Sequence, residues 1–266
     1  MNSLLKKTLL TVVALALVAF AAGCGGDSKT STESPDQAVK NALAKTAGIN
    51  SGNATVKASI AVGSLPGSLA IEGGGAFDKK AKGGGAADLQ FSVEIAGTEQ
   101  SFGLVTYGGK SYLTVEGKAL EQKDSGTSLS PDQVADFIEG LSKYLTNVKS
   151  VPDSENEYTA EVDVKKLLSD SKAGDNLSEL SIPGLGSGQK LAEQVGNADI
   201  TVTIDDEGYA QVLDINLPIN ANGSQGGVRA NIALSDINQP VTIEEPTNVV
   251  SSAAELGGVG AAIAGR

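Results

Sequence analysis

The chain contains no histidine, no tryptophan and one cysteine among its 266 residues. The lack of histidine excludes Ser-His-Asp and Cys-His nucleophiles, an imidazole general base and histidine-ligated metals. A single cysteine excludes an intramolecular disulfide and a cysteine-ligated zinc cluster. The composition therefore points away from an enzyme, and no cofactor and no metal site is predicted.

Positive charge and aromatic side chains are also scarce. The 20 Lys+Arg residues are outnumbered by 32 Asp+Glu residues, giving a net charge of −12, which argues against nucleic acid as a partner. Aromatic residues make up 4% of the chain, which also has 33 glycines. The predicted core is therefore aliphatic and rich in small residues.

The first residues have the pattern of a secretory signal. Lys6 and Lys7 precede an uncharged run, 8–22, that ends in small residues just before Cys24. The run is about 15 residues long, shorter than the roughly 20 that span a bilayer. An uncleaved membrane-spanning anchor is the alternative. The sequence A-A-G-C resembles the lipobox of bacterial lipoproteins, which implies a signal peptide over 1–23 and lipidation of Cys24 as the mature N-terminus.

Residues 24–34 then read as the lipidated cysteine and a flexible polar tether, with an end-to-end distance of roughly 17 Å. Cleavage would leave 18 positive and 32 negative side chains, a net charge of −14. Such a body is predicted to lie outside the cell, held close to the membrane by its lipid but not embedded in it.

Two segments begin with the helix-start sequence Ser-Pro-Asp-Gln, in which serine caps and proline occupies the first turn. They predict helices over 35–47 and 131–146. The second places Val134, Phe137, Ile138, Leu141 and Leu145 on one stripe. Shorter helical segments are predicted at 164–168 and 189–195.

Period-two alternation dominates the remainder and predicts about ten strands joined by short turns, hence a curved antiparallel sheet with one apolar face. The predicted strands lie in 55–62, 65–77, 82–95, 100–107, 110–115, 158–164, 200–204, 209–217, 228–234 and 241–243. The helices are the available covers for the apolar face. The fold class is α+β over 35–246, with a disordered Gly/Ala-rich tail over 247–266.

Two glycine triplets, 73–75 and 83–85, lie symmetrically about Lys79. A turn at 78–80 would place them opposite each other on adjacent strands. They then mark either a bend or bulge in the sheet, or a site of close approach by a helix or an acyl chain.

Catalytic motifs are weak. Ser169 with Lys172, and Ser187 with Lys190, match the S-x-x-K spacing without the other motifs of penicillin-recognising enzymes. Asp205-Asp206-Glu207 lacks the ligand spacing of a calcium loop and reads as a solvated turn.

The lipobox, tether, capped helix, meander, second helix and further strands together resemble the LolA/LppX-type (LppX/LprG-like) lipoproteins. The segments that carry the likeness are LVTYGGKSYLTV (104–115), TVTIDDEGYAQVLDIN (201–216) and PVTIEEP (240–246). The resemblance implies a half-barrel sheet over helices, with a hydrophobic cavity that holds acyl chains of a lipid or glycolipid. The cavity candidates are the apolar residues Phe91, Val93, Ile95, Phe102, Leu104, Val134, Phe137, Ile138, Leu141, Leu213 and Ile215.

Three functions remain open from the sequence. The first is a membrane-anchored carrier or binder of lipids. The second is an envelope scaffold or sensor lipoprotein that binds a protein partner through the half-barrel surface. The third is a hydrolase of envelope polymers, which would need two carboxylates facing each other across a cleft.

Overall fold

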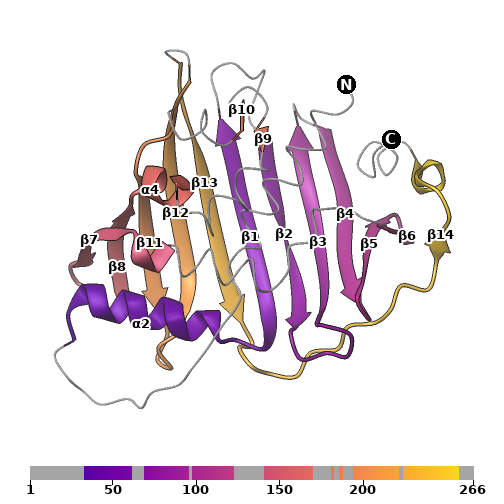
Figure 1. Ribbon diagram of the computed structural model, residues 1–266, viewed down its shortest axis with the longest axis horizontal. Helices are drawn as coiled ribbons and strands as arrows, with labels where there is room; N and C mark the ends of the chain where they lie inside the picture. Colours follow the sequence, from indigo (N-terminus) through magenta and orange to yellow (C-terminus); the bar gives the residue numbers. More distant parts are fainter. Residues whose placement is uncertain are drawn as a thin grey trace.

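The computed structural model describes residues 33–61, 69–95, 98–122, 141–169, 181–182, 186–187, 194–221 and 224–257. Twelve strands form one sheet in the order β14-β6-β5-β4-β3-β2-β1-β13-β12-β11-β8-β7, and β9 and β10 form a separate pair (Figure 1). The strands are β1 (Ser51–Ala61), β2 (Leu69–Asp78), β3 (Ala86–Ile95), β4 (Thr98–Tyr107), β5 (Lys110–Val115), β6 (Lys118–Glu121), β7 (Leu145–Ser150), β8 (Glu157–Val162), β9 (Ser181–Ile182), β10 (Gly186–Ser187), β11 (Ala198–Ile204), β12 (Ala210–Ala221), β13 (Ser224–Ser235) and β14 (Val249–Val250). The helices are α2 (Pro35–Ala47), α4 (Val164–Ser169) and the 3-10 turn η1 (Ala253–Leu256).

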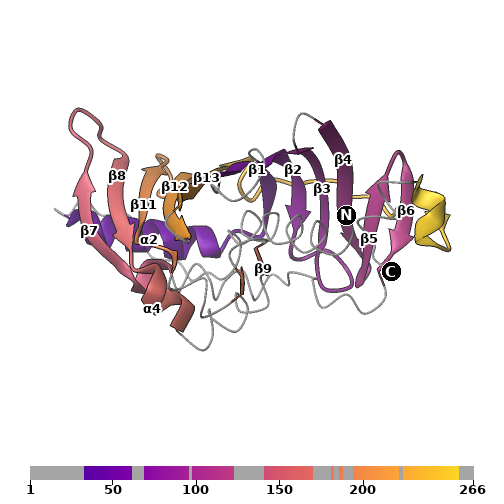
Figure 2. The ribbon, with the colours of Figure 1, turned by 90° about the horizontal axis from the view of Figure 1, so that it is seen from above.

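The sheet consists of two meanders joined in its middle. β1 to β6 follow one another outward, and β7, β8, β11, β12 and β13 return inward, so that β13 pairs with β1 with Ala58 opposite Ala230. Every pairing is antiparallel except the short one between β14 and β6. The sheet is twisted and curved, as expected for so many strands in an open sheet, and α2 and α4 lie on one side of it (Figure 2). The predicted α+β fold with a curved antiparallel sheet is confirmed.

Helix α2 forms as its capping sequence predicts. The Oγ of Ser34 accepts a hydrogen bond from the Gln37 backbone N–H at 3.3 Å, and Pro35 occupies the first helical position. The helix ends before Gly48 and buries Val39, Ala42, Leu43, Thr46 and Ala47. Thr46 is a buried polar side chain, and its Oγ1 accepts from the Ala210 backbone N–H at 2.7 Å, which fixes the end of α2 to β12.

The second predicted helix ends earlier than expected. Residues 131–140 lie outside the described residues, 141–143 are helical, and β7 begins at Leu145. The prediction of helix through 146 is therefore wrong at its end. Leu145 instead pairs with Val162 of β8, because pairing satisfies the backbone groups on the free side of β8.

Three of the strand predictions also need correction. The segment 241–243 is not a strand, since Pro240 and Pro246 flank it and proline offers no ladder donor. β8 stops at Val162 because Asp163 caps α4, where the prediction had continued to 164. The β2–β3 turn covers residues 79–85, so β3 begins at Ala86.

This wide turn separates the two glycine triplets, so the prediction that they face each other is wrong. Gly83, Gly84 and Gly85 have φ values of 96°, 99° and 102° and form the turn itself. Gly73 and Gly74 lie within β2, where they pair with Phe91 and Gln90 of β3. A Cβ at Gly73 would lie 2.8 Å from the Cα of Phe91, so the close approach is made by the neighbouring strand and its aromatic ring.

The prediction of a disordered tail from residue 247 onward is wrong for the first part of that segment. Val249–Val250 forms β14 against β6, and Asn248 O accepts from the Ala119 backbone N–H at 2.9 Å. Leu256 in η1 is 2% exposed and belongs to the main core. After β13, the chain passes below the lower ends of the strands to reach this edge of the sheet (Figure 1).

Candidate functional site

Apolar residues line one face of the sheet in transverse rows. Because side chains alternate between faces, paired residues on neighbouring strands stand side by side on the same face. One row runs through Phe102, Phe91, Gly73, Val56, Ile232, Leu213, Val202 and Tyr158. The next runs through Val93, Ile71, Ala58, Ala230, Ile215, Ile200 and Ala160. The apolar face thus continues from β4 to β8.

The structure brings seven of the predicted cavity residues together on this core. Phe91, Val93, Phe102, Leu141 and Leu213 are buried, and Leu104 and Ile215 are partly buried against them. The rings of Phe91 and Phe102 stack at a centroid distance of 5.6 Å. Ile95 is the last residue of β3, and its side chain lies outside the described part, as do Val134, Phe137 and Ile138.

The described helices cover one end of this face. Helix α2 packs against β7, β11 and β12, and in Figure 1 it crosses the lower part of that half of the sheet. In α4, Val164 and Leu167 are buried in the same core. Over the other half, Phe91 of β3 is 2% exposed and Leu113 of β5 is 2% exposed. The apolar face is therefore buried well beyond the strands on which α2 packs.

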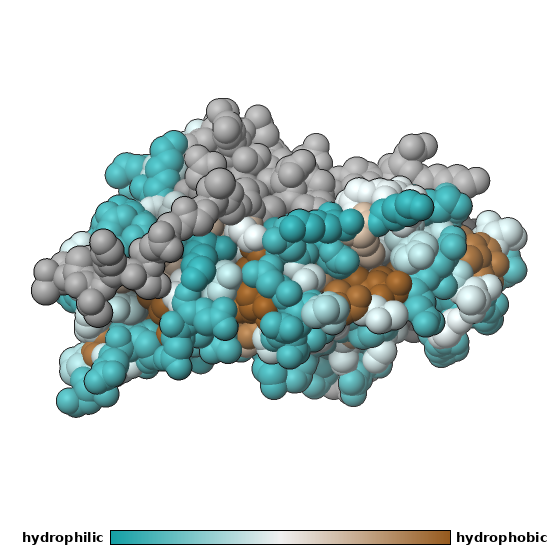
Figure 3. Space-filling model, turned by 90° about the horizontal axis from the view of Figure 1, so that it is seen from below, coloured by the Kyte–Doolittle hydropathy of each residue, from teal (hydrophilic) through white to brown (hydrophobic). Residues whose placement is uncertain are grey.

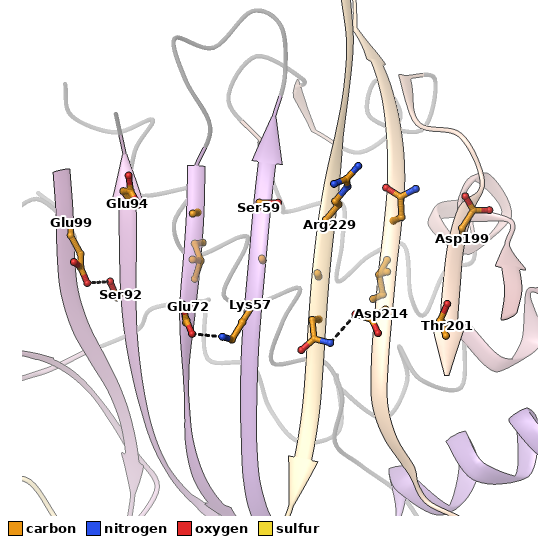
Figure 4. Close-up of a pocket in the computed structure, with 17 residues that line it drawn as sticks. Lys57, Ser59, Glu72, Ser92, Glu94, Glu99, Asp199, Thr201, Asp214 and Arg229 are labelled. Atoms are coloured by element: carbon orange, nitrogen blue, oxygen red, sulfur yellow. Dashed lines mark hydrogen bonds and ion pairs between the residues drawn. The ribbon is translucent and has the colours of Figure 1, made fainter. Parts of the chain in front are cut away.

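The opposite face of the sheet carries a polar trough of about 640 Å³ that the sequence did not predict (Figure 4). It spans β4, β3, β2, β1, β13, β12 and β11, and its side chains alternate with the buried ones. Lys57 forms an ion pair of 2.7 Å with Glu72, and Asn231 Nδ2 donates to Asp214 at 2.8 Å. Ser92 donates to the Glu99 carboxylate. Alternation in the sequence placed these residues on the wet face, but a hollow there requires the curvature of the folded sheet.

Charge in the trough is predominantly negative. Five carboxylates, Glu72, Glu94, Glu99, Asp199 and Asp214, face two cations, Lys57 and Arg229. Lys57 and Glu72 are each about two-thirds exposed, so solvent screens their attraction strongly. Arg229 has no hydrogen bond or ion pair to another residue in the described ranges. The trough is an open, acidic, hydrogen-bonding surface.

The weak catalytic motifs have structural roles where they are described. Ser169 Oγ donates to the Lys165 carbonyl oxygen at 2.7 Å, and Lys172 lies outside the described residues. Ser187 is in β10, with Lys190 again outside. Asp205 Oδ1 accepts from the backbone N–H groups of Glu207 and Tyr209, at 3.0 and 2.8 Å, and so holds the β11–β12 turn.

Two further properties bear on membranes and metals. None of the helices in the described part of the chain is both long and apolar enough to cross a membrane. Within the same ranges, no three His, Cys, Asp or Glu side chains gather as a potential metal site. Cys24 lies outside the described residues, so its lipidation stays a prediction from the sequence.

No protein-family profile and no curated protein sequence matches the chain. Among solved structures, the chain is similar to the crystal structure of LprF from Mycobacterium bovis. The TM-score is 0.46 and the identity 15%, over 80% of this chain and 96% of that one. This similarity is in line with the resemblance of the sequence to the LolA/LppX-type (LppX/LprG-like) lipoproteins.

Proposed function

We propose that the protein is a membrane-anchored extracytoplasmic lipoprotein that binds or carries acyl chains of a lipid or glycolipid, without catalysing a reaction. Cys24 would bear the anchoring lipid, and the ligand would lie against the apolar face of the sheet. The observation that carries the proposal is the breadth of that face, which continues from β4 to β8 and is buried well beyond β7, β11 and β12, the strands on which α2 packs.

The chemistry of this face suits hydrocarbon chains. Its rows are built almost entirely from Val, Ile, Leu, Phe and Ala, with the only buried polar side chain of the described core, Thr46, bonded to the backbone of β12. Apolar pockets with few polar groups favour apolar ligands. In the middle of the face, Ala58 and Ala230 stand side by side and contribute little side-chain bulk.

The proposal is tested by extracting the protein from its native host and analysing bound lipid by mass spectrometry. We expect acyl chains in the extract in addition to those attached to Cys24. An Ala58→Phe variant should lose most of the non-covalent lipid, because its ring would occupy the middle of the apolar face. The matched control is Ala70→Phe, which places the same ring on the opposite face of neighbouring β2.

Both variants are first checked by circular dichroism and thermal melting, so that a folding defect is not read as loss of ligand. Native protein without non-covalent acyl chains would contradict the proposal. Equal lipid content in a folded Ala58→Phe variant would contradict the placement of the ligand.

The acidic trough favours a second candidate, an envelope scaffold or sensor that binds a protein partner through its outer face. Such a partner would present basic residues to Asp199 and Asp214. Crosslinking in intact envelopes should then yield a discrete adduct with the wild-type protein. The adduct should be lost in the Asp214→Lys variant. It should remain in the control variant Glu155→Lys, whose charge change lies on the β7–β8 turn. An adduct insensitive to Asp214→Lys would exclude the trough as the contact.

A further inference from the structure

The turn between β2 and β3, residues 79–85, is a fixed structure at the lower end of the sheet. Lys79 N donates to Asn50 O at 2.7 Å, Lys80 N to Asp78 Oδ1 at 2.8 Å, and Gly85 N to Ala81 O at 3.1 Å. Gly83 packs directly on the β4–β5 turn, where an added Cβ would lie 2.7 Å from Gly108. These contacts hold the turn in one shape.

The same turn carries the densest positive charge of the described chain. A stretch of four residues contains Lys79, Lys80 and Lys82, although the protein as a whole is acidic. The Lys79 ammonium donates to the Ala47 carbonyl oxygen at the end of α2, at 3.2 Å. Lys80 and Lys82 are exposed, and their ammonium groups contact no hydrogen-bonding or ionic partner within the described ranges.

Several other described lysines are neutralised by acids. Lys40, Lys57 and Lys166 form ion pairs of 2.7 to 2.9 Å. On the neighbouring turn, Lys110 pairs with Glu121 at 3.4 Å, and the Glu121 carboxylate raises the pKa of Lys110. Asp206 and Glu207 put negative charge on the β11–β12 turn. The free positive charge of this part of the molecule is therefore concentrated on Lys80 and Lys82.

The basic turn lies beside the element that follows the tether. Helix α2 starts at Pro35, directly after the tether, and its other end touches Lys79. At 1.5 Å per residue, its 13 residues span about 20 Å, similar to the roughly 17 Å reach of the tether. Seen from below, this end also shows bands of apolar surface between hydrophilic side chains (Figure 3).

We propose that the turn at residues 79–85 binds anionic phospholipid headgroups and so orients the anchored domain with this end on the bilayer. The inference rests on the proposed lipid anchor, which holds the turn close enough to the surface for a few charges to matter. The acidic trough disfavours an orientation with the outer face on the bilayer, because an anionic surface repels its carboxylates.

The test uses the full, lipid-anchored chain in vesicles of phosphatidylcholine, alone or mixed equally with phosphatidylglycerol. Because Cys24 is the only cysteine and its thiol would be lipidated, an introduced cysteine is the single site for an environment-sensitive dye. The dye is placed at Ala81 in the turn, or at Ser59 on the outer face as the matched control.

We expect the emission at Ala81 to rise on the anionic vesicles alone, and to return to its value on phosphatidylcholine at high salt. The double variant Lys80→Glu, Lys82→Glu should lose most of the rise while keeping the melting temperature, since both side chains are solvent-exposed. The dye at Ser59 should not respond. An equal rise on both vesicles, a rise that survives charge reversal, or an equal response at Ser59 would overturn the proposal.

Flotation of the same samples separates this proposal from the proposed anchor. Protein that floats with both vesicles without a rise at Ala81 contradicts the orientation alone. Protein that floats with neither contradicts the anchor, and with it the orientation.

Discussion

At the scale of single residues, Gly73 shows how closely the middle of the sheet is packed. It stands opposite both Val56 and Phe91, in the apolar row that crosses the sheet. The absence of a side chain there leaves room for the Phe91 ring, which stacks on Phe102. The close approach of the neighbouring strand is enough to require a glycine at this position.

Gly73→Ala should therefore destabilise the protein. The added Cβ would meet the Gln90 carbonyl oxygen and the Phe91 ring, and overpacking of this kind costs about 1–3 kcal/mol. The measurement is urea-induced unfolding followed by circular dichroism. Gly196→Ala is the control, because its Cβ would meet the Pro218 Cγ at 3.1 Å and the Pro218 carbonyl oxygen at 3.9 Å, a milder contact than the one with the Gln90 carbonyl oxygen at Gly73. Equal urea midpoints for the two variants would show that β2 and β3 can move apart at Gly73 with little loss of stability.

At the scale of elements, α4 depends on the residue that precedes it. Asp163 Oδ1 accepts from the Lys166 backbone N–H at 3.1 Å, and Asp163 Oδ2 pairs with the Lys166 ammonium at 2.9 Å. These hydrogen bonds lower the pKa of Asp163, with the Lys166 side chain as the largest cause. The Asp163 carboxylate therefore caps the N-terminus of the six-residue helix α4. It also places a negative charge there, which the helix dipole favours.

The stabilisation from Asp163 should fade in acid. Because its pKa is lower in the folded than in the unfolded protein, the contribution is complete above the ordinary carboxyl range and is lost as the pH falls through the folded value. Asp163→Ala should lower the free energy of unfolding by about 1 kcal/mol at neutral pH. The loss should become smaller as the pH falls into the range in which the Asp163 carboxylate is protonated.

The measurement is the urea midpoint as a function of pH for the wild type, Asp163→Ala and Asp163→Asn. The asparagine variant keeps an oxygen for the cap and loses the charge, so it should fall between the other two at neutral pH. A difference between wild type and Asp163→Asn that stays constant into acid would contradict the role of the charge.

At the scale of the whole molecule, the C-terminal segment is attached to the sheet at several points. After β13 the chain is held by Ser51 Oγ, which donates to Gln239 O at 2.8 Å, and later by the bond from Ala119 N to Asn248 O. β14 then covers the edge of β6, and Leu256 enters the main core. Residues 240–256 are thus part of the folded domain.

Leu256→Ala should destabilise the entire domain by about 2–5 kcal/mol, because the side chain is 2% exposed and its removal leaves a cavity. Val249→Ala is the control, since Val249 is 49% exposed and should change stability by no more than about 0.5 kcal/mol. Unfolding is followed by tyrosine fluorescence, as the chain has no tryptophan. A near-neutral Leu256→Ala would show that the segment is only loosely attached.

Much of the fold follows from local patterns. The alternation in 55–62 and 89–95 predicts β1 and β3, and Ser34 with Pro35 predicts the start of α2, because these signals depend on neighbours in the sequence. The end of the second helix was mispredicted because Leu141 and Leu145 fit a helical stripe equally well. Only the presence of β8 beside it turns residue 145 into a strand.

The sequence by itself determined which residues are apolar, which face of each strand they share, and that Cys24 follows a signal-like segment. It did so because alternation and charge are properties of consecutive residues. The tertiary structure alone decided that β1 and β13 meet in the middle, that β14 closes an edge, and that the outer face is hollowed into an acidic trough. These features join residues far apart in the chain, and their geometry comes from the accumulated twist of twelve strands.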